Sequence, residues 1–204
     1  NASAKDATIA IQFAEEMSVP FSWFVHVRYQ QAFLEKFRKM NGHEIGVHCY
    51  DHIRYQDEEV AMSDLRKAMD VLEASGIQPK SFCAPFGVWN ESVARAIDSF
   101  GFEYSSEFSY DYDNLPSYPI LGKRLNMLQV PVHPISIGSL RRQGFTEEEM
   151  FSYYMDVVHR KLNAREPMML YHHPNNRHEN VLKGIIEHVK QLHIPALRMI
   201  DYAA

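Results

Sequence analysis

Two histidines stand four positions apart where an apolar segment of the chain ends. The segment GHEIGVHCYDH, residues 42–52, is predicted to be a strand followed by a turn, with His48 and His52 at its end. On a helical turn or tight loop this spacing brings both imidazoles to one side, where neutral ring nitrogens bind a cation at about 2.0–2.1 Å. The chain has eleven histidines, and surface or capping histidines are common, so the spacing alone is a weak signal. The pair is a candidate metal site.

Two further segments carry histidines or a Pro-Gly turn at the end of an apolar run. PMMLYHHP, residues 167–174, is predicted to be a strand that ends in the adjacent His172 and His173. Successive strand residues point to opposite faces, so one of the two histidines is expected to be structural. SFCAPFGVWN, residues 81–90, is predicted to be a strand that ends in a Pro-Gly turn. Cys83 in this segment has no partner histidine identifiable by sequence, which disfavours a nucleophilic role.

The elements that must position these groups alternate along the whole chain. Short apolar runs alternate with helical patterns, which favours βα units and a parallel sheet or barrel. In such folds the ligand site lies at the carboxyl ends of the strands, where all three segments place their polar groups. Helix starts are marked by Asn90 and by Thr146 with Glu149, a capping-box pattern. The predicted strands are residues 21–27, 44–48, 81–84, 103–105, 128–132, 168–172 and 196–200.

Composition sets the outer limits on fold and partners. The 204 residues are predicted to form one domain, residues 1–204. The net charge is -5 and the basic residues form no long run, which disfavours nucleic-acid binding. No apolar stretch approaches the ~20 residues that cross a bilayer, and residues 1–6 lack the pattern of a signal peptide. Two cysteines make no disulfide framework, so the compartment is left open.

The histidine segment resembles the second motif of the polysaccharide deacetylases, the NodB-like family also called carbohydrate esterase family 4. Residues 42–52 follow GHEIGNHTxxH in register, with Val47 and Cys49 as departures. By this resemblance His48 and His52 are metal ligands, and His43 is the non-ligand histidine of the motif opening. The resemblance implies a divalent cation, with Zn²⁺ expected first and Co²⁺, Ni²⁺ and Mn²⁺ as alternatives.

The other two segments are similar to later motifs of the same family. Residues 82–87, FCAPFG, resemble FRxPYG, which implies that the N–H of Phe86 faces the oxyanion and that the segment, with Trp89, borders the substrate. Cys83 stands where the family has an Arg that pairs with the catalytic Asp, and a thiol cannot grip a carboxylate in the same way. In the final motif one histidine acts as general acid. The LxH form selects His172, whereas the His-Pro variant selects His173, which we slightly prefer.

The resemblance also implies a fold and exposes a gap. The family fold is a distorted (β/α)7 TIM-like barrel, NodB-type, and its first strand, which ends in two catalytic Asp residues, is not found in this chain. Counting back from the strand at 21–25 places that motif at or just before Asn1, so we expect upstream residues in the natural protein. Asp51, inside the histidine segment, is predicted to act as a second-layer partner of the ligands instead.

The implied function is metal-dependent hydrolysis of N-acetyl groups on an amino sugar or polysaccharide. An amidohydrolase of the same superfamily acting on a small amide is one alternative, and a non-catalytic carbohydrate-binding relative is another. The expected partner is therefore a carbohydrate or small amide, and the oligomeric state is open, as is the choice between cytoplasm and cell envelope. Trp89 and Tyr104 are candidates to stack on a sugar, although core positions are commoner for such residues. The acidic loop with Glu107, Asp111 and Asp113 is a candidate to shape substrate entry, although a solvated loop is expected first.

Overall fold

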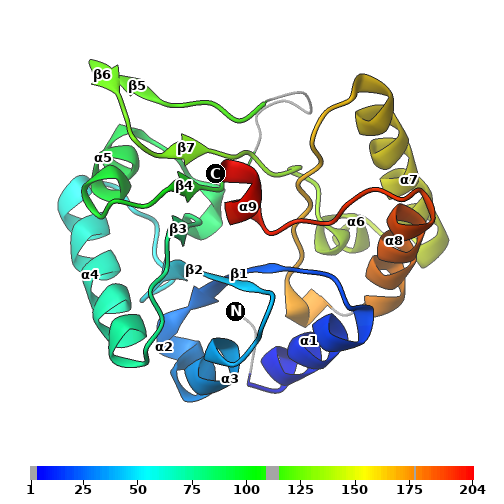
Figure 1. Ribbon diagram of the computed structural model, residues 1–204, viewed down its shortest axis with the longest axis horizontal. Helices are drawn as coiled ribbons and strands as arrows, with labels where there is room; N and C mark the ends of the chain where they lie inside the picture. Colours follow the sequence, from blue (N-terminus) through cyan, green and yellow to red (C-terminus); the bar gives the residue numbers. More distant parts are fainter. Residues whose placement is uncertain (1–3, 109–114, 177) are drawn as a thin grey trace. The chain divides into compact units, whose positions relative to one another are not determined.

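The computed structural model describes residues 4–108, 115–176 and 178–204 (Figure 1). The chain separates into two compact units, and each is described by itself. Unit 1 comprises residues 1–19, 109–115 and 132–196, and unit 2 comprises residues 20–108, 116–131 and 197–204. The assignment of residues 1–204 to one deacetylase domain stays a prediction.

Five parallel strands form the sheet of unit 2, in the order β1-β2-β3-β4-β7. This confirms the predicted α/β fold with a parallel sheet, while closure into a barrel stays a prediction. The longest pairing joins β1 to β2, from Ser22 opposite Glu44 to His26 opposite Cys49. The strands are β1 (Ser22–His26), β2 (Glu44–Cys49), β3 (Ser81–Phe82), β4 (Tyr104–Ser105) and β7 (Leu128–Gln129), and a separate antiparallel pair consists of β5 (Ile120–Leu121) and β6 (Lys123–Arg124).

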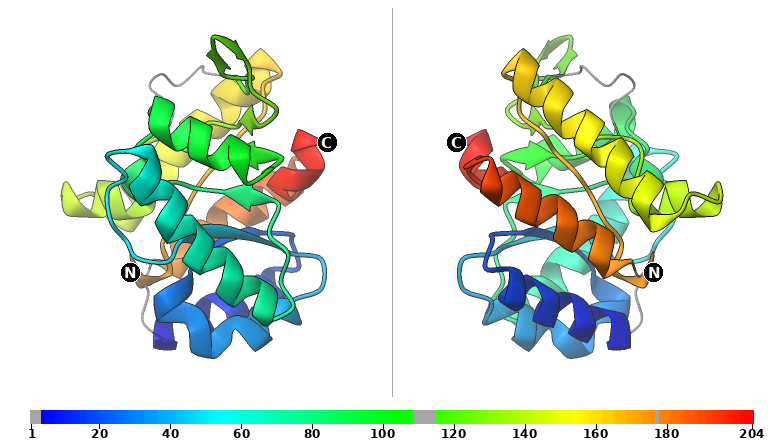
Figure 2. Two further views of the ribbon diagram at one scale, coloured as in Figure 1. Left: turned by 90° about the vertical axis from the view of Figure 1, so that its left-hand side faces the viewer. Right: turned by 90° about the vertical axis from the view of Figure 1, so that its right-hand side faces the viewer.

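Two amphipathic helices, α4 (Glu58–Ala74) and α5 (Glu91–Ser99), cover the sheet in unit 2. The left view of Figure 2 shows them side by side in front of the strands. Asn90 accepts a hydrogen bond from the N–H of Val93, which confirms the predicted start of α5. The apolar residues Ala61, Leu65, Ala68 and Leu72 form a buried stripe on the core-facing side of α4. The shorter helices of this unit are α2 (Val27–Gln30), η1 (Gln31–Phe33), α3 (Leu34–Arg38), η2 (Pro85–Gly87) and α9 (Met199–Ala203).

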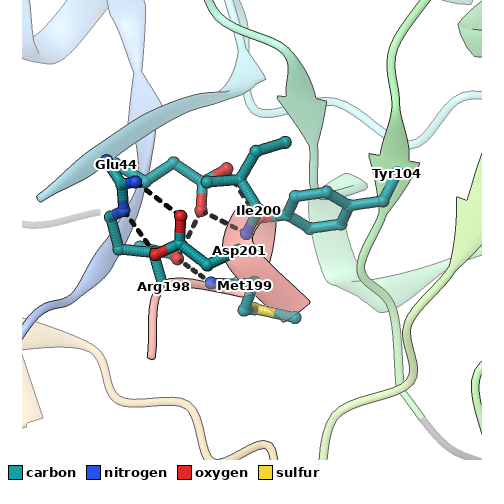
Figure 3. Close-up of polar contacts among 7 residues, drawn as sticks. Glu44, Tyr104, Arg198, Met199, Ile200 and Asp201 are labelled. Carbon is teal, nitrogen blue, oxygen red and sulfur yellow. Dashed lines mark hydrogen bonds and ion pairs between the residues drawn. The ribbon is translucent and has the colours of Figure 1, made fainter. Parts of the chain in front are cut away.

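A buried carboxylate ties the strands of unit 2 together at their amino ends. Glu44, the first residue of β2, accepts hydrogen bonds from the hydroxyls of Ser22, Ser81 and Tyr104 at 2.5, 2.5 and 2.7 Å. The N–H of Ile200 in α9 donates to the same carboxylate at 3.1 Å (Figure 3). Because these hydroxyls belong to the first residues of β1, β3 and β4, the contact joins four strands and α9. Tyr104 is fully buried here, so its predicted role in stacking on a sugar is wrong.

Unit 1 is built from helices. They are α1 (Ala4–Met17), α6 (Ile137–Arg142), α7 (Glu147–Ala164), η3 (Pro174–Asn176) and α8 (Glu179–Gln191). Helices α7 and α8 pack through a buried apolar cluster that includes Met150, Tyr154 and Ile185, and the right view of Figure 2 shows them side by side. Thr146 and Glu149 form the predicted capping box at the start of α7. None of the described helices combines the length and apolarity that crossing a bilayer requires.

Two of the predicted strands are wrong. Residues 168–172 belong to no strand, and one backbone hydrogen bond, from the N–H of His133 to the carbonyl of Met169, involves them. Residues 196–200 lead into α9 instead. The side chains of Ser22 and Glu44 accept hydrogen bonds from the N–H groups of Met199 and Ile200, so these N–H groups are not available for a neighbouring strand. Arg198 binds Asp201 one helical turn further on.

Candidate functional site

The sheet of unit 2 places His48 and His52 close together at its carboxyl end. His48 lies in β2, and His52 lies in the loop that follows this strand. Their ring centroids are 5.0 Å apart, with an angle of 52° between the ring planes. Burial lowers the pKa of His52, which favours the neutral imidazole that a metal requires.

A backbone carbonyl sets the tautomer of His48. Its Nδ1 lies 2.7 Å from the carbonyl oxygen of Cys83, in the loop after β3. A carbonyl oxygen only accepts, so Nδ1 carries the proton and donates, and the lone pair of the neutral ring is on Nε2. Metal-binding histidines in proteins are commonly oriented by such a bond from their second nitrogen. The arrangement therefore fits a ligand that binds through Nε2.

His26 is a third histidine at this end of the sheet, and the sequence analysis missed it. It is the last residue of β1, and its ring centroid is 5.6 Å from that of His52. Burial, followed by the nearby His52, lowers the pKa of His26 to about 4. His26 is therefore neutral above about pH 4. Its position at the end of β1, beside the strand that carries His48, is the sequence signal that could have identified it.

The described residues supply two imidazoles for a cation and no complete ligand set. Among them, no group of three or more His, Cys, Asp or Glu side chains is arranged to hold a metal ion. The predicted partner Asp51 accepts a hydrogen bond from Arg28 at 2.5 Å, so its carboxylate is engaged in an ion pair at the surface. The chemistry of both imidazoles, their closeness and the orientation of His48 fit two ligands of a divalent cation, and further ligands are required.

The segment after β3 forms an aromatic wall beside His52. Phe86 has φ 61° and ψ 9°, a left-handed conformation that is strained for a side chain of this size. Its half-exposed ring lies 4.5 Å from the ring of His52 in an edge-to-face arrangement, and the guanidinium of Arg54 lies 5.6 Å from the ring centroid. Strain of this kind persists where the surroundings impose it, which is typical of functional sites.

Two other predicted site residues in this segment, Cys83 and Trp89, are both partly buried. Burial, followed by the charge of Glu107, raises the pKa of the Cys83 thiol, so a nucleophilic thiolate is disfavoured. Cys49 and Cys83 are both free thiols. The indole Nε1 of Trp89 is buried and has no hydrogen-bond partner among the residues that the structure describes.

Glu107 corrects the expectation of a solvated loop. It lies two residues after β4 and is 1% exposed. Its carboxyl accepts hydrogen bonds from the Ser105 hydroxyl at 3.0 Å, the Ala84 N–H at 3.3 Å and the Gln129 amide at 3.4 Å. Burial raises its pKa to about 7. The two other acidic residues of that predicted loop, Asp111 and Asp113, lie outside the described residues.

The candidate general acids His172 and His173 belong to unit 1. Burial lowers the pKa of His172 to about 4, and its Nδ1 is buried without a partner among the described residues. His173 is exposed, and its ring packs edge-to-face on Tyr171 with centroids 5.4 Å apart. The side chain that is in contact with solvent suits proton exchange better, which keeps His173 as the preferred residue. Both assignments stay predictions.

Comparison with known proteins shows which family the sequence and fold of this chain resemble. The polysaccharide deacetylase family model matches residues 6–105, which include the histidine segment and the segment around Phe86. A probable polysaccharide deacetylase from Pseudomonas aeruginosa is 25% identical, with a TM-score of 0.78 over 97% of this chain and 71% of that one. Residues 6–105 thus match the polysaccharide deacetylase family, and the fold is that of solved polysaccharide deacetylases. A search of curated proteins gives no significant match.

Other deacetylase-like structures share the fold at lower identity. An allantoinase is 24% identical, with a TM-score of 0.79 over 97% of this chain and 70% of that one. A pseudoenzyme of carbohydrate esterase family 4 from Bacillus anthracis is 14% identical, with a TM-score of 0.67 over 98% of this chain and 61% of that one. The polysaccharide deacetylase fold therefore occurs with different activities, and the side chains of this chain must decide the function.

Proposed function

We propose that this protein is a metal-dependent deacetylase that hydrolyses N-acetyl groups on an amino sugar or polysaccharide. The match of residues 6–105 to the polysaccharide deacetylase family supports deacetylation of acetylated sugars. The observation that carries the metal dependence is the pair of His48 and His52, with His48 oriented by the Cys83 carbonyl so that its Nε2 can bind. Zn²⁺ is the expected cation, and Co²⁺, Ni²⁺ and Mn²⁺ are alternatives.

His48 and His52 would hold the cation, which when bound supplies Lewis-acid polarisation of the acetamide and of the attacking water. The chain's own groups have three further roles. The Phe86 N–H donates to the developing oxyanion, a contribution of roughly 3 kcal/mol in comparable sites. The Phe86 ring and Trp89 border the substrate. One of the two histidines at 172 and 173 protonates the leaving amine, and His173 is the preferred residue. The proton of the attacking water would pass to a general base, the role that the resemblance gives to an Asp of the first motif.

A second candidate activity is hydrolysis of a small cyclic or linear amide. The similarity to an allantoinase favours it. A non-catalytic carbohydrate-binding relative is the third reading, and a pseudoenzyme of the same fold shows that loss of activity occurs on this scaffold. Substrate range separates the first two candidates, and bound metal separates both from the third.

The direct test is acetate release from N-acetylglucosamine oligomers, measured beside ammonia or ring-opening assays on small amides. Wild type is expected to release acetate, and His48→Ala is expected to lose at least about 100-fold of that activity because a ligand is gone. His159→Gln is the matched control. It removes an exposed histidine of unit 1 whose Nε2 lies 3.2 Å from that of His188, close enough for the two to chelate an ion themselves. Equal activity in wild type and His48→Ala would reject the site.

A further inference from the structure

Asp64 is a buried acidic residue in the middle of α4, and it faces the loop that carries His52. It is 4% exposed. Its Oδ1 accepts a hydrogen bond from the N–H of Asp51 at 2.8 Å. Its Oδ2 accepts from the N–H of Tyr50 at 2.8 Å and from the Tyr55 hydroxyl at 2.6 Å. One carboxylate thus receives three donors from a single loop.

These three donors bracket His52 in the sequence. Tyr50 and Asp51 precede the histidine, and Tyr55 follows it. Tyr55 is buried, and its backbone carbonyl accepts a further hydrogen bond from the Asn90 amide at the start of α5. Burial and the bond to Asp64 raise the pKa of the Tyr55 hydroxyl, so it remains a donor. The loop is therefore held at both sides of His52, and His48 is held separately by β2 and the Cys83 carbonyl.

Helix stability alone gives no reason for an acidic residue at this position. Asp57 already caps the start of α4, and Asp is a poor residue for a helix interior. The other buried positions of α4 are apolar: Ala61, Leu65, Ala68 and Leu72. Burying a carboxylate among them is costly unless hydrogen bonds compensate, and here every compensating donor comes from the His52 loop. The placement is explained by what the carboxylate does for that loop.

We propose that Asp64 is a positioning residue for the candidate metal site: by fixing the backbone of residues 50–51 and the Tyr55 side chain, it sets the place of His52 relative to His48. The inference rests on the proposed function, because it names the cation as the ligand that both imidazoles share. On this proposal, α4 supplies no metal ligand but fixes the position of one ligand, His52, through Asp64. Partners of this kind commonly change metal affinity by about 10–100-fold when they are removed.

The test compares Zn²⁺ binding by two isosteric variants on one helix, Asp64→Asn and Asp70→Asn, both made in the His159→Gln background. Asp70 is exposed on α4, so the second variant makes the same charge change without touching the loop. Calorimetric titration is expected to show the dissociation constant for Zn²⁺ raised by about 10–100-fold in Asp64→Asn and unchanged in Asp70→Asn. Tyr55→Phe removes one of the three bonds and keeps a core aromatic, so a smaller rise is expected even if Asp64→Asn folds poorly.

Amide hydrogen exchange in the metal-free protein gives a second, independent readout. Asp64→Asn is expected to speed exchange at Tyr50 and Asp51 and to leave the amides of β3 unchanged. Unchanged exchange at these two amides, or equal Zn²⁺ affinity in Asp64→Asn and Asp70→Asn, would overturn the positioning role. A wild-type protein that binds no Zn²⁺ would instead defeat the proposed function, and the exchange measurement would still decide whether Asp64 holds the loop.

Discussion

The two ends of the sheet in unit 2 each bury a glutamate, and the two are satisfied very differently. At the amino end, Glu44 accepts four hydrogen bonds of 2.5–3.1 Å from three strands and α9. At the carboxyl end, Glu107 accepts three bonds of 3.0–3.4 Å, and burial raises its pKa to about 7. The first carboxylate joins elements of the fold, whereas the second is poorly compensated.

This contrast extends to the residues around each glutamate. The carboxyl end holds Phe86 in a left-handed conformation and buries the Trp89 Nε1 and Ser106 Oγ atoms without partners among the described residues. Strained and incompletely satisfied groups reduce stability, and they persist where function requires them. We infer from this difference that the amino end of the sheet stabilises the fold, whereas the carboxyl end carries the candidate site. Substitutions at matched positions can break or sharpen this division.

The largest expected effect is that of Glu44→Ala. Removing the carboxylate leaves buried hydroxyls of Ser22, Ser81 and Tyr104 without their acceptor, so the free energy of unfolding should fall by at least about 3 kcal/mol. Urea denaturation measures the change. The control Glu103→Ala removes an exposed carboxylate paired with Lys80 and should cost less than about 1 kcal/mol. Similar losses in both variants would remove the special role of the amino end.

The next effect concerns pH and Glu107→Gln. The pKa of Glu107 is about 7 in the folded protein, above its ordinary value of 4.5. The contribution of this group to stability is therefore greatest below pH 4.5 and falls as the pH rises to about 7. Glutamine cannot ionise, so the stability difference between wild type and variant should shift by about 3 kcal/mol between about pH 4 and pH 8.

Thermal unfolding across pH checks this prediction. The buried histidines, such as His26 and His133 with pKa lowered to about 4, produce the opposite slope in both proteins, so subtraction removes them. Stability curves for wild type and Glu107→Gln that run parallel from acid to neutral pH would contradict the assignment of a poorly compensated carboxyl.

Serine-to-alanine substitutions at the two ends of the sheet should affect the free energy of unfolding differently. Ser81→Ala removes a donor to Glu44 and should lower the free energy of unfolding by about 1 kcal/mol. Ser106→Ala removes a buried hydroxyl that has no partner among the described residues, so it should leave stability unchanged or raise it by up to about 1 kcal/mol. Chemical denaturation of both variants measures the signs, and destabilisation of equal size would refute the contrast.

The smallest effect isolates the backbone strain at Phe86. Phe86→Gly and Phe86→Ala both remove the ring beside His52, but only glycine accepts φ 61° without a steric cost. The glycine variant should therefore be more stable than the alanine variant by about 1 kcal/mol, and both should raise KM if the ring borders the substrate. Equal stability of the two variants would show that the conformation stores no strain.

The sequence predicted the elements whose signals are local. The strands at β1 and β2, the helix start at Asn90 and the capping box at Thr146 follow from periodicity and short-range hydrogen bonds, and the structure has them. The alternation of apolar runs and helical patterns predicted the parallel sheet, and residues 42–52 and 82–87 predicted the resemblance to polysaccharide deacetylases. The spacing of His48 and His52 in the sequence also predicted that they lie close together, and their ring centroids are 5.0 Å apart.

Features that depend on long-range contacts could not be predicted in this way. Apolar residues suggested a strand at 196–200, but bonds to Ser22 and Glu44 use its N–H groups and a helix forms. Glu107 was expected in solvent because of its charge, although its place just after β4 could have signalled the carboxyl end of the sheet. Asp64 has no local signal, since its donors are 9 to 14 residues away in the chain.

The central claim, that His48 and His52 share one cation, is tested most directly by zinc X-ray absorption on the Zn²⁺-loaded protein in the His159→Gln background. The account predicts scattering from two imidazoles at about 2.0–2.1 Å, reduced to one imidazole in both His48→Ala and His52→Ala. A zinc spectrum without imidazole scattering, or one that neither substitution alters, would contradict it.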